Sequence, residues 1–376
     1  MVSKWQAAQS LSRMDDYPLH QIADTMRHVG TSDRNFYDRY YFNLHNSSGE
    51  LFMVMGMGQY PTLAVQDAFV ALRRGNAHRV VRASRELDDR ADTSVGPIRI
   101  EVLEGLQKLR FVLEPNEWGL AMDLVWEGAI PAFLEPRQYV RRKGRVFFDS
   151  VRFAQTGCWS GWLEIDGECH AVTPDRWKGS RDRSWGIRPV GEHEPAGIHH
   201  GTHSMQGMWN YCPMQFDDHS ILYICNELDD GRRELEEAMR IWADPEREPE
   251  WLGRPEYEHT FDAAKEFITA STIRFPGAPG GAFEVQCTPL LPMYLFIGTG
   301  YGVDADWKHG MHKGPLVVEG LSLDHERDRG RFFGLIDSPC RFETGGKVGW
   351  GLFEYCFMGP FERYGISNPL FWNLKL

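Results

Sequence analysis

The chain has 376 residues, of which 42% are hydrophobic and 25% are charged, and it contains 13 Trp, 13 Tyr and 22 Phe. The formal net charge of -12 argues against nucleic acids and anionic membrane surfaces as partners, because binding phosphate groups needs a basic surface. The length favours two domains over one, and the many aromatic rings predict large apolar interiors.

The cysteines and the N-terminus predict a cytoplasmic protein. The seven cysteines are an odd number and form no CxxC pair, which is typical of reduced thiols. Residues 1–6 lack the apolar segment of a secretory signal. No apolar run approaches the ~18 residues of a membrane-spanning helix, so we expect no integral membrane segment.

The first predicted element is a short helical segment within residues 3–29. Leu19, Ile22, Met26 and Val29 recur at helical spacing, and Gly30 suits the end of a helix. From there the pattern changes to short apolar or alternating runs between Gly, Pro, Asn and Asp, which predict strands. The expected strands are residues 35–44, 51–57, 109–113, 120–126, 159–165, 221–225, 282–287, 294–297 and 331–336. This pattern favours an all-β fold of antiparallel barrels or sandwiches.

A domain junction is predicted at residues 189–203, which are rich in Pro, Gly and charge and lack periodicity. It divides the chain into 1–200, the helical segment with a first barrel, and 201–376, a second barrel. The glycines of 298–302 are too few for a dinucleotide fingerprint, so we expect no organic cofactor.

The segment Arg176–Arg188 carries the densest chemistry. Its two indoles, Trp177 and Trp185, accompany several cationic side chains and one carboxylate, Asp182. Neighbouring positive charge favours an ionised Asp182, whereas apolar burial would leave it protonated and able to donate. One interpretation is a catalytic acid whose cationic intermediate faces the indoles. The alternative is a structural hub in which Asp182 pairs with neighbouring arginines such as Arg188.

A second candidate acid is Glu354, within an aromatic run. Strand alternation places the even-numbered residues 350–356, from Trp350 to Cys356, on one face and Phe353, Tyr355 and Phe357 on the other. If the first face points inward, Glu354 is a buried acid with a raised pKa; otherwise it is an ordinary solvated residue.

Two further strands hold candidate pocket residues. On 35–44, Tyr40 shares a face with Phe42, while Arg39 lies on the opposite face, so each face can line a pocket or a barrel core. The flexible thioethers of Met53, Met55 and Met57 also suit either an adaptable pocket or a filled core.

Metal and hydrolase sites have weak support. The histidines His193, His199, His200 and His203 lie in the predicted junction, and no HExxH pattern occurs, so we expect a polar linker and no metal. Ser184 and Ser204 have no GxSxG context, which argues against a hydrolase triad.

Three motifs in order resemble the carotenoid hydratase and AttH-like superfamily, which is related to tocopherol cyclase and fungal decalin-forming Diels–Alderases. They are Gly157–Gly161 leading to 165–168, the element Arg181–Arg188, and the closing run Gly349–Tyr355. The resemblance implies two lipocalin-like (calycin) barrels side by side, with a pocket for isoprenoid or polyketide ligands at or near their interface. Relatives often carry His where this chain has Arg183, which removes a neutral proton shuttle.

These observations favour a cofactor-independent hydratase, cyclase or isomerase, that is, a lyase or an isomerase, acting on a small hydrophobic molecule. The substrate would be isoprenoid, steroid-like or polyketide. Asp182 or Glu354 would be the acid, and the substrate contacts would be Trp177, Trp185, Arg188, Tyr40 and Trp350. The alternative functions are a non-catalytic carrier or sensor of hydrophobic metabolites, and a structural protein with filled barrels. The sequence is also compatible with a homodimer.

Overall fold

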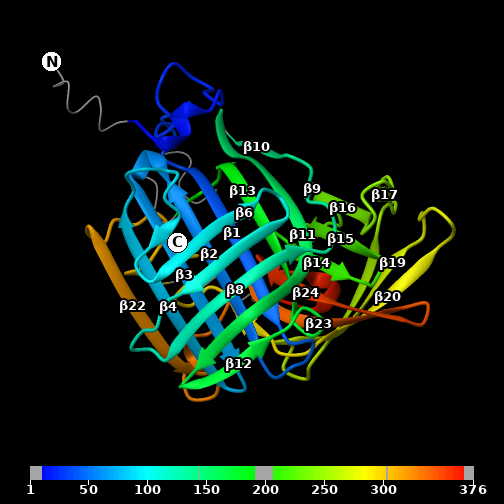
Figure 1. Cartoon of the computed structure of the whole chain (residues 1–376). Coiled ribbons are helices and arrows are strands. Elements are labelled where there is room, and N and C mark those ends of the chain that lie inside the picture. Colours follow the sequence, from blue (N-terminus) through cyan, green and yellow to red (C-terminus); the bar gives the residue numbers. More distant parts are fainter. Residues whose placement is uncertain (1–10, 143, 191–205, 302–303, 368–376) are drawn as a thin grey trace.

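The computed structural model describes residues 11–142, 144–190, 206–301 and 304–367 (Figure 1). In these residues, helical structure is limited to 3-10 turns at Arg13–Asp16, Pro61–Leu63, Arg329–Arg331 and Glu362–Tyr364. All other regular structure is strand, arranged in two antiparallel sheets. The predicted all-β class is confirmed. Among the described residues, no helix has the length and apolarity to cross a membrane.

The first sheet has the strand order β22-β4-β3-β2-β1-β13-β11-β8-β7-β6-β5, with β9, β10 and β12 attached to β11. Its strands are β1 (Phe36–His45), β2 (Phe52–Tyr60), β3 (Val65–Arg74), β4 (Ala77–Glu86), β5 (Ser94–Val95), β6 (Ile98–Glu104), β7 (Lys108–Leu113), β8 (Leu120–Gly128), β9 (Phe133–Leu134), β10 (Gln138–Arg142), β11 (Arg145–Ile165), β12 (Glu168–Val172), β13 (Lys178–Ile187) and β22 (Leu316–Asp324). Figure 1 shows this sheet curling so that β6, β7 and β8 cross over β1 to β4.

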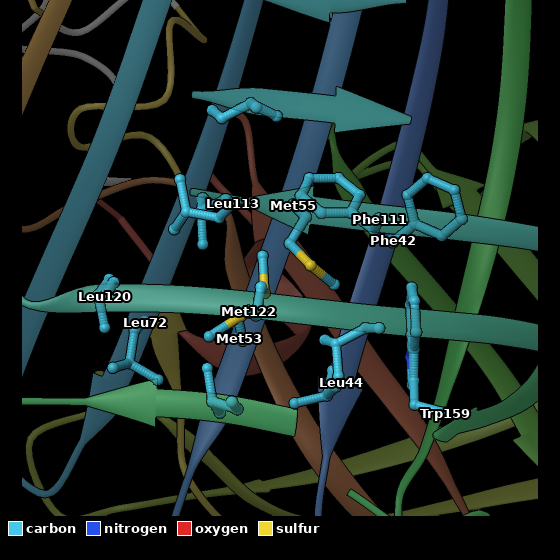
Figure 2. Close-up of a cluster of buried hydrophobic side chains, with 14 of the residues drawn as sticks. Phe42, Leu44, Met53, Met55, Leu72, Phe111, Leu113, Leu120, Met122 and Trp159 are labelled. Atoms are coloured by element: carbon cyan, nitrogen blue, oxygen red, sulfur yellow. The ribbon is translucent and has the colours of Figure 1, made fainter. Parts of the chain in front are cut away.

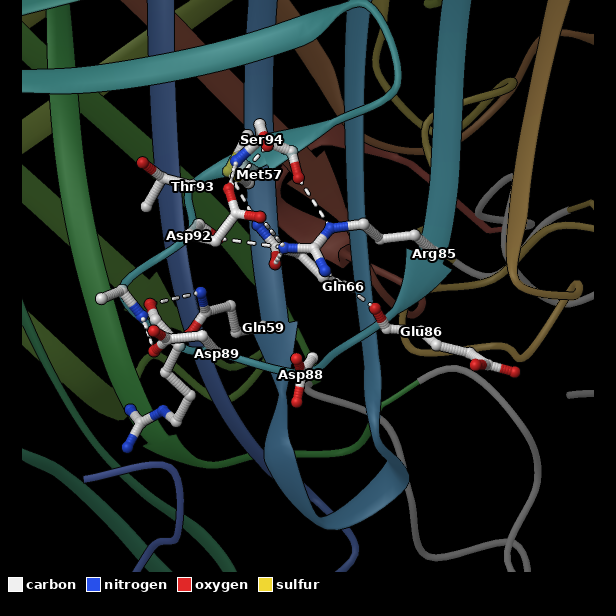
Figure 3. A network of polar contacts seen from close by, with 12 residues as sticks. Met57, Gln59, Gln66, Arg85, Glu86, Asp88, Asp89, Asp92, Thr93 and Ser94 are labelled. Atoms are coloured by element: carbon white, nitrogen blue, oxygen red, sulfur yellow. Dashed lines mark hydrogen bonds and ion pairs between the residues drawn. The ribbon is translucent and has the colours of Figure 1, made fainter. Parts of the chain in front are cut away.

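A polar network closes the curl (Figure 3). Arg85 on β4 donates from Nη2 to Gln66 Oε1 on β3 at 2.9 Å. Its Nε donates to the Ser94 carbonyl oxygen on β5 at 2.7 Å, and its guanidinium lies 3.0 Å from the Asp92 carboxylate. The end strand β5 is therefore joined to β3 and β4, next to β22 at the other end, and the sheet curls into a barrel.

The interior of this first barrel is filled. Figure 2 shows Phe42, Met53, Met55 and Phe111 packed between the crossing layers of strands, all with almost no exposed surface. Trp159 completes the packing, with its ring centroid 5.6 Å from that of Phe42. The methionines of β2 therefore belong to a packed core and not to a ligand pocket.

The second sheet has the order β17-β16-β15-β14-β24-β23-β20-β19-β18, with β21 attached to β23. Its strands are β14 (Met208–Gln215), β15 (His219–Glu227), β16 (Arg233–Trp242), β17 (Glu250–Trp251), β18 (Glu256–Phe261), β19 (Ile268–Phe275), β20 (Phe283–Pro289), β21 (Met293–Tyr294), β23 (Ile336–Thr344) and β24 (Lys347–Phe357). This sheet curls into a half-barrel with its own apolar core.

The two sheets pack against each other through a third apolar cluster. Tyr41 and Val54 of the first sheet belong to the same cluster as Leu222 and Leu352 of the second. The second half of the chain also contributes one strand to the first sheet, because β22 pairs with β4 along its whole length. Apart from β22, the sheets separate on either side of the predicted junction 189–203, most of which lies outside the described residues.

Three predicted elements are wrong in the described part of the chain. Of the expected strand 294–297, only Tyr294 lies in a strand, because β21 ends there and a turn follows. In residues 11–29 the expected helix is replaced by the 3-10 turn Arg13–Asp16 and irregular chain. Pro18 cannot donate a helical hydrogen bond, and Leu19 and Ile22 are 49% and 39% exposed, so no apolar face is buried. The expected strand 331–336 is a 3-10 turn followed by irregular chain, and β23 begins only at Ile336.

Candidate active site between the two sheets

A cavity of about 250 Å³ lies between the two sheets. The first sheet and its loops supply mostly polar lining: Tyr37, Arg39, Tyr40, Tyr41, Glu135, Arg152, Asp182, Ser184 and Arg188. The second sheet and its loops supply mostly apolar lining: Trp209, Ile224, Leu235, Phe296, Leu335, Glu354, Cys356 and Met358. The cavity therefore has a charged wall facing an apolar wall.

Strand pairing builds the charged wall. Asp182 on β13 lies opposite Tyr41 on β1 and opposite Ala154 on β11. Ser184, two residues on, lies opposite Arg39 and Arg152. Because side chains alternate along a strand, these residues share one face. The segment that follows Asp182 thus lines the cavity at every second residue.

Gly186 continues this face between Ser184 and Arg188. Its φ of 127° is a backbone conformation that residues with a Cβ rarely adopt. A Cβ there would lie 2.2 Å from the carbonyl oxygen of Asp149 on the neighbouring strand. The glycine of the Ser-Trp-Gly element is therefore required by the close approach of β11 to β13.

The Asp182 carboxyl group makes no hydrogen bond or ion pair with any described residue. Burial raises its pKa, and the positive charges of Arg152, Arg188 and Arg39 oppose that rise. The described residues do not form the structural hub in which Asp182 pairs with neighbouring arginines. Arg183 pairs with Asp38 instead, and Arg181 donates from Nε to Gln155 Oε1 at 2.8 Å. Asp182 is thus an acid on the cavity wall whose carboxyl group has no partner among the described residues.

Glu354 faces the cavity from the second sheet. Its Oε1 accepts a hydrogen bond from Trp209 Nε1 at 2.5 Å. The alternation expected for residues 350–357 is confirmed, since Leu352 packs between the sheets while Phe353 and Tyr355 lie in the core of the half-barrel. Burial raises the pKa of Glu354, so the inward-facing, buried alternative holds.

Asp337 pairs with Glu354 across β23 and β24 and is completely buried. The Tyr41 hydroxyl donates to Asp337 Oδ2 at 2.6 Å. Burial and the neighbouring Glu354 raise the pKa of Asp337 well above its ordinary range. The two acids titrate together, and the hydrogen bond between them favours the proton on Asp337.

A buried ion pair lies beside Asp182. Arg152 donates from Nε to Glu135 Oε2 at 2.6 Å, and its guanidinium lies 4.3 Å from the centre of the Tyr211 ring. Burial raises the pKa of Glu135, and Arg152 opposes the rise. The Arg152 guanidinium is therefore held at the cavity by Glu135 and forms no ion pair with Asp182.

Four of the seven residues predicted from the sequence line this cavity: Asp182, Glu354, Arg188 and Tyr40. The other three lie elsewhere, and their predicted substrate contacts remain untested. Trp177 is buried in the core of the first barrel. Trp185 is on the opposite face of β13, 6.4 Å from Phe153 between ring centroids. Trp350 is 6.5 Å from His45 between ring centroids, outside the cavity lining.

The sequence analysis missed Glu135, Arg152, Trp209 and Asp337. A carboxylate within the apolar run 335–337 is a usable signal for Asp337, because such a residue seldom enters a buried strand without a partner. Glu135 carries no comparable signal, since only the pairing of strands brings it to Arg152.

The described residues contain no group of three or more His, Cys, Asp or Glu placed to hold a metal ion. His193, His199, His200 and His203, considered as metal ligands from the sequence, lie outside the described residues.

Comparisons with known proteins support the fold. The profile of a family of unknown function (DUF8625) matches residues 11–367. The crystal structure of a protein provisionally assigned as AttH, from Nitrosomonas europaea, has a TM-score of 0.52 and 15% identity over 94% of this chain and 98% of that one. CghA with Sch210972 has a TM-score of 0.47, 11% identity and coverage of 86% and 88%; CghA alone has 0.45, 10%, 86% and 88%. None of the curated proteins matches the chain. The resemblance to the AttH-like superfamily is thus confirmed for the fold.

Proposed function

Since the chain belongs to DUF8625, a family of unknown function, we propose its function from its own site: acid-catalysed hydration, cyclisation or isomerisation of a small, largely apolar molecule. One observation carries the proposal. Asp182 and Glu354, on opposite sheets, line the same cavity, and burial raises the pKa of both.

The cavity volume sets the size of the substrate. A cavity of 150 Å³ binds benzene, so about 250 Å³ holds roughly ten non-hydrogen atoms. A short isoprenoid or a compact polyketide unit is of this size, whereas a whole carotenoid is much larger. The resemblance to the AttH-like superfamily supports a substrate of this apolar kind.

Each acid has a distinct role. Asp182, which has no protein partner among the described residues, donates a proton to an alkene or carbonyl group of the substrate. Glu354, held by Trp209 Nε1, accepts a proton from the intermediate or from water. Tyr40 and Arg188 contact the substrate, and the apolar wall excludes bulk water and orients the chain. Protonation of this kind needs no organic cofactor.

The test begins with a native mass spectrum of protein purified from its own host, which identifies a retained ligand. Turnover of that ligand is then compared in the wild type and in Asp182→Asn. We expect a loss of about 10²- to 10⁴-fold in turnover with ligand affinity retained. Asp123→Asn is the matched control, since Asp123 pairs with Arg110 on the outer face of the barrel.

Two outcomes contradict the proposal. Full turnover by Asp182→Asn removes Asp182 from the chemistry. A wild-type protein that retains its ligand and releases it chemically unchanged is a carrier or sensor, which is the alternative function.

A further inference from the structure

Two arginines that line the cavity and lie near His309 lack a carboxylate ion-pair partner. Arg39 is 3% exposed, and its guanidinium donates from Nη1 to the His309 ring and lies 5.0 Å from the centre of the Tyr301 ring. The Arg188 guanidinium lies 4.3 Å from the centre of the Tyr37 ring. Neither arginine forms an ion pair with any described residue. Both line the cavity.

His309 does not neutralise Arg39. Its Nε2 lies 2.9 Å from the Thr299 carbonyl oxygen, and burial together with Arg39 holds the pKa of His309 well below its usual range. The ring is therefore neutral and accepts the hydrogen bond from Arg39 at Nδ1. Asp67 interacts electrostatically with Arg39 but forms no ion pair with it. The Asp67 carboxylate accepts hydrogen bonds from the Gly310 N–H at 2.8 Å and from the Tyr60 hydroxyl at 3.3 Å.

Other buried arginines of the described chain show the usual solution. Arg82 lies 2.6 Å from Glu319, Arg152 lies 2.6 Å from Glu135, and Arg233 lies 2.7 Å from Glu227. Buried charges are normally paired in this way. Arg181 also lacks a carboxylate, but it donates to Gln155 and does not line the cavity. The cavity is therefore where two guanidinium groups remain available to a ligand.

Resting on the function proposed above, we propose that Arg39 and Arg188 form a subsite for an anionic group of the substrate. The substrate is then an amphiphile, with an apolar body and a carboxylate or enolate oxygen at one end. Guanidinium groups suit this role because their planar donors match carboxylate oxygens and stay charged when partly buried. The body lies against the apolar wall of Ile224, Leu235 and Leu335.

The strand register places the proposed subsite and the acid on the same wall of the cavity. Arg39 pairs with Ser184, and Asp182 is two residues further along the same face. The Cα atoms of two such residues are about 7 Å apart. The substrate is therefore expected to reach Asp182 while its anionic group contacts Arg39.

Anion binding also prepares the acid. Arg39 and Arg188 oppose the protonation of Asp182 in the free protein. A bound anion cancels part of their positive charge, so the pKa of Asp182 rises further when the substrate is present. The substrate itself favours the protonated, donating form of the carboxyl group.

The experiment compares two probes of the same chain length, octanoate and 1-octanol, by titration calorimetry at pH 7.5 on the full chain. We expect the wild type to bind octanoate at least about tenfold more tightly than octanol. Arg188→Gln should weaken octanoate binding by about tenfold and leave octanol binding within about twofold. Arg39→Gln, with a thermal unfolding check, should repeat the effect.

The matched control is Arg99→Gln, because Arg99 pairs with Glu101 at the surface of the first barrel. It should change neither affinity. Equal affinity for the two probes, octanoate affinity unchanged in Arg188→Gln, or failure of octanoate to bind each overturns the subsite. Octanol has no charge, so its binding tests the cavity alone. If octanol binds and the subsite is contradicted, the proposed acid catalysis is unaffected. If Asp182→Asn keeps full turnover while octanoate is still preferred over octanol, the acid catalysis is contradicted and the anion subsite is retained.

Discussion

The interior of the first barrel and the space between the sheets are built from the same strands but are filled in opposite ways. On β1, Phe42 and Leu44 face the barrel, whose interior is closely packed with apolar side chains (Figure 2). On its other face, Arg39 and Tyr41 meet a cavity of about 250 Å³. One strand thus serves packing on one face and polar chemistry on the other.

The barrel interior therefore contributes mainly stability, whereas the space between the sheets holds the groups available for chemistry. Packing in the barrel stabilises the fold through volume, so removing atoms there is costly. Around the cavity, unpaired charge and empty space reduce stability but leave groups available to a ligand. Four mutations test this separation.

The largest effect is expected in the barrel. Trp159→Ala removes a ring that packs against Phe42 and Trp126 and also the hydrogen bond from Nε1 to the Asn43 carbonyl oxygen. We expect the free energy of unfolding to fall by about 3–5 kcal/mol, measured by urea titration. A loss under about 1 kcal/mol would show that the barrel interior is not tightly packed.

A histidine buried against His325 and Phe332 should make the fold sensitive to acid. Burial first, then His325 and Arg73, lower the pKa of His78 from 6.5 to about 3. Between these values the unfolded chain binds more protons, so stability is full above pH 6.5 and falls as the pH falls. At pH 4.5 the loss from His78 is about 3 kcal/mol.

His78→Leu removes this titration. Urea unfolding at pH 7 and pH 4.5 should show a smaller loss in the variant by about 3 kcal/mol. Parallel losses in the two proteins would contradict a buried, neutral His78.

Asp337 in the cavity region should act with the opposite sign. Its folded-state pKa is raised well above 3.8, so the folded state binds more protons than the unfolded state above pH 4. Stability therefore falls as the pH rises toward that raised pKa. Asp337→Asn keeps an acceptor for the Tyr41 hydroxyl and removes the titration. Between pH 5 and pH 8 the variant should therefore lose less stability than the wild type in urea unfolding.

Asp123→Asn is the control, because the Asp123 carboxylate pairs with Arg110 and its pKa is lowered. Its unfolding curve should keep the wild-type dependence between pH 5 and pH 8. Identical curves for Asp337→Asn and the wild type would instead place Asp337 outside the coupled acids.

The smallest effect is expected on the apolar wall of the cavity. Leu235 is half-buried beside empty space, so Leu235→Ala should cost less than about 1 kcal/mol in urea unfolding. The larger cavity should bind 1-decanol more tightly relative to 1-octanol than the wild type does. A loss as large as that of Trp159→Ala would erase the distinction between the two regions.

Alternation within single strands was predictable from the sequence. It placed Glu354 on the face opposite Phe353. Asp182 was predicted by a different signal, the concentration of charged and aromatic residues in 176–188, and it does line the cavity. Pairing between distant strands was not, because register is fixed by the whole sheet and not by local pattern. Asp337 meets Glu354, and Arg152 meets Glu135, only after such pairing.

The N-terminal helix and the indoles show a second limit. Leu19 and Ile22 recur at helical spacing, but no surface covers them, and an apolar spacing without a partner surface does not make a helix. Trp177 and Trp185 are close to Asp182 in sequence, yet one lies in the barrel core and the other on the opposite face of β13. Closeness along a strand does not determine which side a ring occupies.

The pairing of β22 with β4 affects how the protein is made. During synthesis, β4 ends at residue 86 and its partner begins only at residue 316, so one edge of the first sheet stays unpaired while most of the chain emerges from the ribosome. Unpaired edges of this kind template aggregation. A fragment that stops before β22 keeps that edge open, so we expect the first half of the chain to aggregate when it is made alone.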